Sequence, residues 1–384
     1  MDLSLTEEQA MIQDMARKFA ETELAPVAAQ LDEHNDQALF QANLAKLAEL
    51  GFMGLNIRAE YGGVEAGSVA FSLAITELAR ACAATAVTTS VTNMVAEVIQ
   101  AVGNEQQKQA YLPKLCSGEY LAGGFCLTEA NAVSDPAGMT TSASKDGEHY
   151  LLNGSKIYIT SGTFAGIFVV WAVTDPSANK GKGISCFLVE ANTPGVTIGK
   201  CEHKMGQKAS PTTEVHFENC RIPASAMLGQ ENKGFGIAVG ELAGGRIGIG
   251  SLALGIGLAA LDYAKAYISQ RKQFGQLLSN FQGLQWKLAE RYTDLEAARL
   301  LLMQAACLKE QGKPFATSAS MAKLFASEKA NQACYDALQL LGGAGYIREY
   351  PLERLARDVR ITTIYEGTSE IQKVIIARDL LSTV

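Results

Sequence analysis

The spacing of apolar residues is helical at both ends of the chain and changes in the middle. In residues 1–119, Met11, Met15 and Phe19 recur at every fourth position, which places them on one face of a helix. Further helical patterns cover about 36–51, 68–83 and 104–115. We therefore predict an N-terminal helical domain over residues 1–119.

Short apolar runs replace the helical spacing after Gly123. Turn signals such as Asn153-Gly154 and Thr193-Pro194-Gly195 separate these runs. The runs cover His149–Leu152, Ile167–Val173, Ile184–Val189 and Thr213–Phe217. They follow one another too closely for helical crossovers, so a parallel α/β sheet is disfavoured. We predict a small β-barrel or sandwich in a middle domain over residues 120–230.

Helical periodicity returns in residues 231–384. Five residues keep to one face of a long helical pattern, namely Leu284, Leu288, Tyr292, Leu295 and Leu302. The three parts together predict an α+β multidomain fold, with an N-terminal helical domain, a central small β-barrel or sandwich and a C-terminal four-helix bundle.

Composition narrows the classes of function. Of the 384 residues, 48% are hydrophobic and 19% are charged, so the chain is able to bury a large core. The 33 basic and 40 acidic residues give a net charge of −7 without a long basic run, which argues against a nucleic-acid partner. The eight cysteines form no CxxC pair and the four histidines lack ligand spacing, so we expect no metal site.

The start of the chain and its longest apolar run bear on location. The first residues, MDLSLTEEQA, are acidic where a targeting segment would be basic. The run Ile247–Leu261 is shorter than the ~18 residues that span a bilayer. We expect a cytoplasmic protein of bacterial type with no membrane span. A GxGxxA string at Gly255 lies inside this run with no strand before it, so helix packing explains its glycines better than dinucleotide binding.

Four segments hold residues that could carry chemistry. They are Phe125–Asp135, Tyr158–Gly162, Gln339–Tyr346 and Ile364–Gln372. The first offers N–H and hydroxyl groups to an anionic or heteroaromatic ligand, and the second offers an aromatic ring beside a hydroxyl group. An ordinary turn and an ordinary strand end would have the same compositions, so composition alone leaves both interpretations open.

The third and fourth segments are more informative. Three glycines follow Gln339 where one would be enough to end a helix, which suggests a close approach of the backbone to another group. In the fourth segment, Glu366 stands between an aromatic residue and a glycine, and Thr368 is placed to cap the last helix. A carboxylate held beside apolar groups is a candidate general base, because burial raises its pKa. The alternative is a solvated loop glutamate.

Taken together, the four segments resemble the acyl-CoA dehydrogenase family of flavoproteins, in order and in spacing, over essentially the whole chain. The stretch Gln339–Asp358 fits the family signature Q-x-x-G-G-x-G-Y with its spaced acidic and basic positions. The string IYEGTSEIQ is similar to the family's catalytic segment. The resemblance also implies the order helix, β, helix.

The resemblance implies a site for FAD, an acyl-CoA and a catalytic base. Residues expected to hold the flavin ring and its neighbourhood are Phe125, Leu127, Thr128, Ser134, Tyr158, Ile159, Thr160, Thr368 and Glu370. Residues expected on the adenine side, across a subunit interface, are Arg271, Phe274, Gln282, Gln339, Leu340, Gly342 and Gly343. Residues expected to contact the substrate are Ser134, Gly245, Arg246 and Gly367.

The implied reaction is the α,β-dehydrogenation of a short-chain or short branched acyl-CoA to a trans-2-enoyl-CoA. Glu366 would take the α-proton while the β-hydride goes to flavin N5, and the amide of Glu366 would help to bind the thioester oxygen. Some family members carry the base one residue before the arginine, but here that residue is Gly245, and Glu241 lies too far along the helix. Electrons would pass to an electron-transfer flavoprotein, and the enzyme would be a homotetramer.

Three residues depart from the family pattern, and three other functions stay open. Val133 stands where the flavin loop has a glycine, so we expect strain there if φ is positive. Tyr158 replaces a tryptophan, and Ala243 replaces an aspartate that contacts pantetheine. An acyl-CoA oxidase or a flavin monooxygenase would keep the flavin segments. A non-catalytic CoA-ester-binding protein would keep the fold without the reaction.

Overall fold

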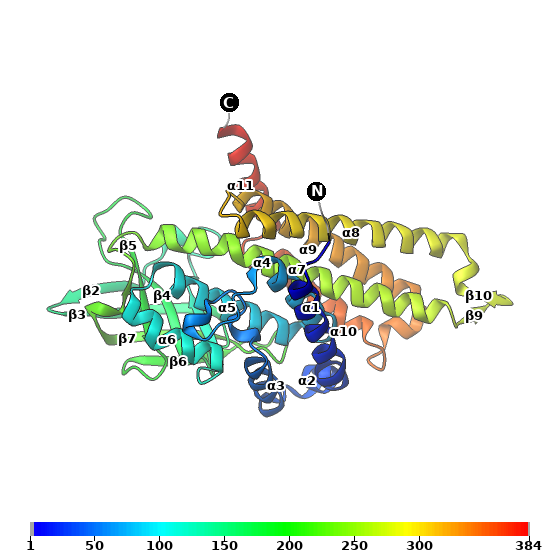
Figure 1. The fold of residues 1–384 in the computed structure, drawn as a ribbon, viewed down its shortest axis with the longest axis horizontal. Helices are drawn as coiled ribbons and strands as arrows, with labels where there is room; N and C mark the ends of the chain where they lie inside the picture. The colour runs from blue at the N-terminus through cyan, green and yellow to red at the C-terminus, as the bar shows by residue number, and fades with distance from the viewer. Residues whose placement is uncertain (1–3, 383–384) are drawn as a thin grey trace.

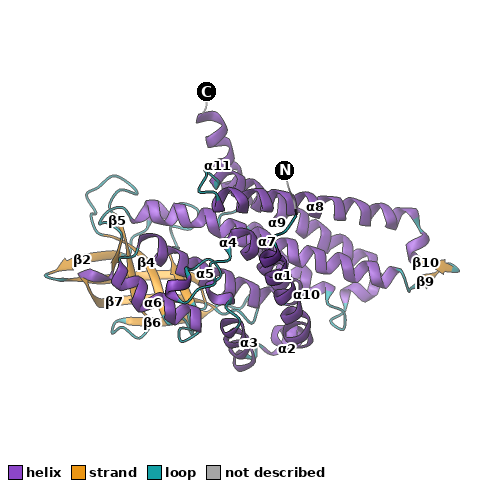
Figure 2. Cartoon of the chain, in the orientation of Figure 1, coloured by secondary structure: helices purple, strands orange, loops and turns teal. Residues whose placement is uncertain are grey.

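The computed structural model describes residues 4–382, with a strand-rich end and a longer helical body (Figure 1). Apart from one short hairpin, the strands gather at a single end of the molecule (Figure 2). A helical N-terminal part, a central β-sheet domain and a helical C-terminal part follow one another along the chain. This confirms the predicted fold class, and we keep the domain borders at 119/120 and 230/231 as a proposal.

The N-terminal part is helical throughout, but two of its helices, Ala28–His34 and Ala83–Val102, have no counterpart among the predicted patterns. Its helices are α1 (Glu7–Phe19), α2 (Ala28–His34), α3 (Gln37–Glu49), α4 (Gly67–Ala81), α5 (Ala83–Val102) and α6 (Glu105–Ser117). The pattern of the sequence indicates α3, α4 and α6 but no separate helix for α5, which is rich in Thr and Val and so has weak intrinsic propensity. The α5 helix forms because most of its side chains are buried, including Thr88, Thr89 and Thr92.

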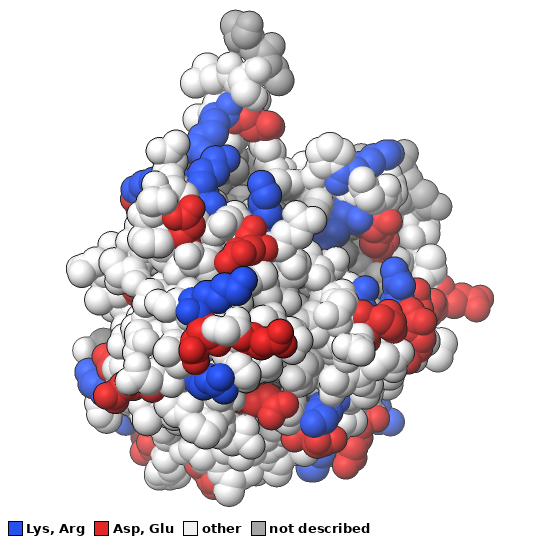
Figure 3. Space-filling model, turned by 90° about the vertical axis from the view of Figure 1, so that its left-hand side faces the viewer, with Lys and Arg blue, Asp and Glu red and all other residues white. Residues whose placement is uncertain are grey.

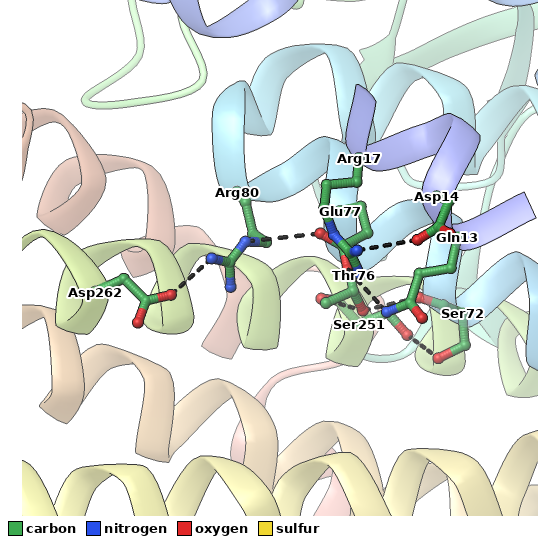
Figure 4. A network of polar contacts seen from close by, with 9 residues as sticks. All are labelled: Gln13, Asp14, Arg17, Ser72, Thr76, Glu77, Arg80, Ser251 and Asp262. Atoms are coloured by element: carbon green, nitrogen blue, oxygen red, sulfur yellow. Dashed lines mark hydrogen bonds and ion pairs between the residues drawn. The ribbon is translucent and has the colours of Figure 1, made fainter. Parts of the chain in front are cut away.

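Helix α1 packs with a different face from the one predicted. Met11 is 71% exposed, whereas Ile12, Ala16 and Phe19 are buried, so the expected Met11–Met15 stripe is wrong. The reason lies in α4, where the buried carboxylate of Glu77 needs polar partners. The carboxylate accepts hydrogen bonds from Gln13 and Arg17 of α1 (Figure 4). Met11 and Met15 lie on the other side of the helix and so face outward.

The middle of the chain forms one eight-stranded sheet. Its strands are β1 (Gly123–Cys126), β2 (Ser142–Asp146), β3 (His149–Thr160), β4 (Ile167–Val173), β5 (Ile184–Glu190), β6 (Val196–Cys201), β7 (Thr212–Pro223) and β8 (Met227–Leu228). They lie in the order β6-β7-β3-β2-β4-β5-β8, and β1 pairs with β4. Most pairs are antiparallel, in line with the disfavoured parallel α/β sheet, although β4 pairs in parallel with both β1 and β2. The polar strand β2 and the exposed strand β6 lack an apolar run and were not predicted.

Strand β4 shows how the sheet is buried on both faces. Ile167, Val169 and Trp171 point to a core shared with α5 and α6. The alternate residues Phe168 and Val170 point to a second core made by the strands themselves. One face of the sheet therefore packs against helices, and the other face encloses a core made by the strands alone. This packing holds the ends of β1 and β3 against the helical body.

The C-terminal part is built around one long central helix. Its helices are α7 (Gly234–Ile268), α8 (Gln282–Glu310), α9 (Ala316–Leu340), α10 (Leu352–Arg360) and α11 (Ser369–Ser382), and a hairpin of β9 (Lys272–Gln273) and β10 (Gln276–Leu277) joins α7 to α8. A Cβ atom built on Gly255 would lie 2.2 Å from the carbonyl oxygen of Thr76 in α4. One built on Gly257 would lie 3.1 Å from Cβ of Ala330 in α9. The glycines of the GxGxxA string thus serve close helix packing, as predicted.

Helix α7 also corrects the expectation about its length. It has 35 residues, and an 18-residue window has a mean hydropathy of 1.6, so its length and composition alone would suffice to cross a membrane. Inside the protein, however, 78% of that window is buried. Its apolar character is explained by its place at the centre of the helical body. Toward the strand-rich end, basic and acidic side chains are mixed, without a patch of one sign on the visible face (Figure 3).

Candidate active site

Glu366 lies on a strained turn that points its carboxyl group into the protein. The turn joins a short 3-10 helix (Ile361–Thr363) to α11, and φ is 54° at Glu366 and 90° at Gly367. A glutamate in the left-handed region is uncommon, and such residues gather at functional sites. The carboxyl group reaches α7, because a Cβ atom built on Gly245 would lie 3.1 Å from Oε2 of Glu366.

Gly245 is the point where three elements meet. The same hypothetical Cβ would lie 2.8 Å from Sδ of Met94, which comes from α5. The glycine therefore leaves the space that the carboxyl group of Glu366 and the thioether of Met94 occupy. An acidic side chain at position 245 would compete for this space, so the two alternative base positions of the family exclude each other here.

The charge state of Glu366 is set by burial and by two cations. Its Oε2 atom is buried and has no hydrogen-bond partner within residues 4–382. Burial raises the pKa of Glu366 to about 7, against the positive charges of Arg246 and Lys323, which lower it. Arg246 is itself only 5% exposed, and burial lowers its pKa. A carboxyl group with a pKa near neutrality suits a general base.

Two buried side chains hold the backbone of the turn. Nζ of Lys323 on α9 donates to the carbonyl oxygen of Gly367 at 2.8 Å. Nε2 of Gln372 on α11 donates to the carbonyl oxygens of Glu366 at 3.0 Å and Gly367 at 2.8 Å. The hydroxyl of Thr368 accepts from the amide of Ile371 and caps α11, as predicted.

A buried polar chain ties this turn to the end of β3. Gln207 donates from its side chain to the hydroxyl of Tyr365 at 3.3 Å, and from its backbone amide to Asp358. Burial raises the pKa of Asp358 to about 6. Further along the same loop, the carbonyl of Pro211 accepts from the amide of Ser161 at 2.8 Å. The second and fourth sequence segments are thereby joined through residues 207–211.

The first and second segments meet at the ends of β1 and β3. A Cβ atom on Gly124 would lie 3.3 Å from Cγ2 of Ile159, and the carbonyl of Thr128 accepts from the amide of Ile157. Ile159 is buried, but Tyr158 is 58% exposed with φ of 60°. This leaves an aromatic ring on an open surface, at an irregularity in the pairing of β3 with β7.

A buried ion pair that sequence reasoning missed fixes the first segment. Lys156 is fully buried, and its Nζ donates to Glu129 at 2.8 Å and to the carbonyl of Leu127 at 3.1 Å. Glu129 also accepts from the amides of Thr140 and Thr141. Although burial opposes it, the charge of Lys156 and these hydrogen bonds lower the pKa of Glu129 to about 2. The backbone of residues 127–129 is therefore held from inside the sheet.

These surroundings fit the flavin that the sequence predicts. Near the end of β3, the hydroxyl groups of Ser161 and Thr213 are buried without a hydrogen-bond partner within residues 4–382, and so is that of Ser369 at the start of α11. Buried hydroxyl groups of this kind call for a polar partner. Together with the exposed ring of Tyr158, they suit a planar heteroaromatic group with polar edges.

The residues expected on the adenine side do not join this site within one chain. The β9–β10 hairpin carries Phe274, 93% exposed, at the end of the molecule opposite the β-sheet domain (Figure 1). Arg271, Gln282, Gln339, Gly342 and Gly343 are exposed, and Leu340 is buried. Their role in binding FAD stays a proposal, and it requires a second subunit.

The remaining predicted residues have simple surroundings. Phe125 is partly buried against Trp171, with ring centroids 4.3 Å apart, and Leu127 is buried. Ser134 is exposed. Val133 is 50% exposed and is not among the residues with positive φ, so the strain expected there is absent. Residues that are partly buried are Thr160, Gly367 and Thr368, and Glu370 is exposed.

Comparisons with known proteins agree with the resemblance seen in the sequence. Residues 6–119, 124–220 and 232–381 match the N-terminal, middle and C-terminal domains of acyl-CoA dehydrogenase. The chain is 46% identical to an acryloyl-CoA reductase (NADH) of Anaerotignum propionicum, over 99% of this chain and 96% of that protein. It is 45% identical to the short-chain specific acyl-CoA dehydrogenase of Clostridium acetobutylicum, over 98% and 99% of the two chains. The structure of butyryl-CoA dehydrogenase from Megasphaera elsdenii is similar, with a TM-score of 0.96, 43% identity and coverage of 99% and 100%.

Proposed function

The chain belongs to the acyl-CoA dehydrogenase family of oxidoreductases, and on this premise we propose that it oxidises a short-chain acyl-CoA to the trans-2-enoyl-CoA with FAD as cofactor. The observation that carries the proposal is the buried carboxyl group of Glu366, packed against Gly245 with one oxygen unpaired. A buried oxygen without a hydrogen-bond partner costs free energy, so its presence here points to a function.

Glu366 is the base in this proposal. Its carboxylate takes one of the two α-protons of the acyl group onto Oε2. The hydride on the β-carbon leaves from the face of the acyl chain opposite to Glu366. Bound FAD supplies the acceptor for that hydride. The carboxylate needs no large pKa change to act near pH 7, because burial has already raised its pKa to about 7.

The backbone of the same turn binds the thioester oxygen. The amide N–H of Glu366 donates to no protein acceptor in the described part of the chain, residues 4–382. The left-handed turn, held by Lys323 and Gln372 at its carbonyl groups, orients this N–H. A fixed donor at the oxygen where negative charge develops lowers the barrier to removal of the α-proton.

The packing of α5 on α7 supports a short acyl group. A Cβ on Gly248 would lie 2.3 Å from Oγ of Ser90 and 3.3 Å from the ring of Phe71. One turn before, Met94 fills the space at Gly245. Because the helices beside Glu366 are in close contact over this turn, the space next to the carboxyl group suits about four to six acyl carbons better than a long chain.

The proposed partners follow from the family. The proposed electron acceptor is an electron-transfer flavoprotein, and the proposed assembly is a homotetramer in which exposed residues such as Phe274 would complete the FAD site of a neighbouring subunit. Arg246, buried beside the turn, contacts the acyl-CoA through its unpaired Nε.

A second candidate is the reverse reaction. The Anaerotignum relative, 46% identical over nearly the whole chain, is named for the reduction of acryloyl-CoA with NADH. By microscopic reversibility, the carboxylic acid of Glu366 would then return the proton to the α-carbon. Dehydrogenation is favoured because the Clostridium and Megasphaera relatives carry dehydrogenase names.

Anaerobic titration of the purified yellow holoenzyme tests the proposal. We expect butyryl-CoA and hexanoyl-CoA to bleach the flavin rapidly, on a time scale that stopped-flow mixing resolves, and palmitoyl-CoA to bleach it at least ~10²-fold more slowly. The reduced enzyme is then mixed separately with oxygen, NAD⁺ and an electron-transfer flavoprotein. Rapid reoxidation by oxygen would indicate an oxidase, and failure of every acyl-CoA to bleach the flavin would overturn the proposal.

A further inference from the structure

Lys323 is an ammonium group buried in a helix surface that otherwise carries small residues. It lies on α9 in the same stripe as Ala319, Ala326 and Ala330, all of which are 0% exposed. Lys323 is 0% exposed as well. The stripe packs against α7, and a Cβ on Gly250 would lie 3.4 Å from Cα of Lys323. The side chain therefore has no route to solvent across the α7–α9 contact.

The buried charge of Lys323 is not neutralised by an ion pair. Its Nζ donates a hydrogen bond to a neutral acceptor, the carbonyl oxygen of Gly367, at 2.8 Å. No carboxylate lies within 4.0 Å of its Nζ among residues 4–382. Burying an unpaired ammonium group is expensive, so a lysine kept in this position points to a role beyond packing.

The charged groups around Lys323 come from three further elements and its own helix. Glu366 on the catalytic turn and Glu370 on α11 act as anions, Glu328 on α9 is a third anion, and Arg246 on α7 is a second cation. Burial lowers the pKa of Lys323 to about 8, so it still carries its charge at pH 7. Of the anions, Glu366 has the largest electrostatic effect on Lys323, and Glu370 is exposed to solvent.

We propose that Lys323 is a positioning residue for the dehydrogenation, which holds the Glu366–Gly367 turn by its hydrogen bond to Gly367 and keeps Glu366 in the ionised, proton-accepting form by its buried charge. The inference rests on the proposed role of Glu366 as the base. The hydrogen bond and the charge are separate contributions. Gln372, which is uncharged, donates to the same carbonyl oxygen of Gly367 and also to that of Glu366, so the backbone remains held when Lys323 is replaced.

The two contributions are separated by four substitutions in the full-length holoenzyme. Lys323→Met removes charge and donor, Lys323→Gln removes the charge and keeps a donor, and Lys323→Arg keeps the charge. Gln372→Met removes a neutral donor to the same turn. The control is Lys373→Met on α11, whose side chain is 59% exposed and lies 3.8 Å from Glu328 at the surface.

The main measurement is the pH dependence of flavin reduction by butyryl-CoA in single-turnover mixing. At low pH the rate of reduction falls as Glu366 becomes protonated, and we call this part of the pH profile the acid limb. We expect the acid limb to move up by about one pH unit in Lys323→Met and Lys323→Gln. The rate would then be about tenfold lower at pH 6 and little changed at pH 9. The limb should stay in place in Lys323→Arg, Gln372→Met and Lys373→Met. The shift is upward because removing a nearby cation destabilises the carboxylate form of Glu366 and so raises its pKa.

A second measurement does not depend on turnover. The protonated carboxyl band of Glu366 is followed by infrared difference spectroscopy over the same pH range, and it is assigned by its loss in Glu366→Gln. The band should titrate about one unit higher in the two neutral Lys323 variants. Thermal unfolding is recorded for each variant, and Lys323→Met should be at least as stable as the parent, because it removes a buried unpaired charge.

The outcomes separate the inference from the function on which it rests. An unchanged acid limb and band in both neutral variants would overturn the role of Lys323 while leaving Glu366 as the base. Full activity of Glu366→Gln would instead overturn the base assignment itself. If neither neutral variant yields folded holoenzyme, Lys323 serves the fold and the inference is wrong.

Discussion

Gly245 and Glu366 share one space: a side chain that began at Gly245 would meet Oε2 of Glu366 at 3.1 Å. The first residue is in the middle of a 35-residue helix and the second on a left-handed turn, more than a hundred residues later. A glycine inside a helix costs about 1 kcal/mol relative to alanine. The helix accepts this cost at position 245 because the carboxyl group has to lie there.

Gly245→Ala should therefore slow flavin reduction by about tenfold without loss of FAD, because the new methyl group pushes Glu366 and Met94 a few tenths of an ångström from their positions. Stopped-flow reduction by butyryl-CoA and the flavin absorbance spectrum measure the two effects. Gly240→Ala on the same helix is the matched control, because a Cβ atom there meets nothing within 4 Å. Equal rates for both variants would show that the space at Gly245 is not critical.

Glu366→Gln should lower the rate of flavin reduction by about 10²–10⁴-fold, because the amide has nearly the shape of the carboxyl group but does not accept the α-proton. Binding of FAD and of butyryl-CoA should stay within about threefold of the parent, as measured by flavin absorbance and calorimetry. Glu49→Gln, a change at an exposed residue at the end of α3, is the control. Turnover near that of the parent would remove Glu366 from the mechanism.

Much of the fold was predictable because its signals are local. The long periodic patterns gave α3, α4, α6 and the C-terminal helices, and the apolar run Ile167–Val173 coincides with β4. Prediction failed where tertiary packing overrides local preference. The Thr-rich helix α5 is stable only because it is buried, and α1 turns Met11 outward because Glu77 of α4 needs Gln13 and Arg17.

The candidate site was predictable only through its motif residues. Glu366 and Tyr158 stood out by their neighbours in the sequence, whereas Met94, Gln207 and the Lys156–Glu129 pair come together only through the fold. A charged residue in a stripe of small apolar residues was the one available signal for Lys323. Phe274, which the resemblance places on the adenine side, lies on the β9–β10 hairpin at the opposite end of the molecule from the β-sheet domain (Figure 1).

The rate of flavin reduction should fall as the pH drops below about 7. Burial raises the pKa of Glu366 to about 7, and only the carboxylate form accepts a proton, so each unit further below this pKa lowers the rate by about tenfold. Single-turnover mixing with butyryl-CoA from pH 5 to 9 measures this limb. An acid limb near pH 4.5, the ordinary value for a glutamate, would contradict the burial seen at this site.

Lys156→Met should destabilise the β-sheet domain and weaken FAD binding together. The substitution leaves the buried carboxylate of Glu129 without its cation, which costs about 3–5 kcal/mol, and it frees the carbonyl of Leu127 in the flavin segment. Denaturant unfolding and FAD titration of the stripped protein measure both effects. The control is Lys180→Met, which breaks the solvent-exposed pair with Asp135 near the same segment and should cost at most about 1 kcal/mol. If both variants unfold alike and bind FAD like the parent, the buried pair does not support the flavin segment.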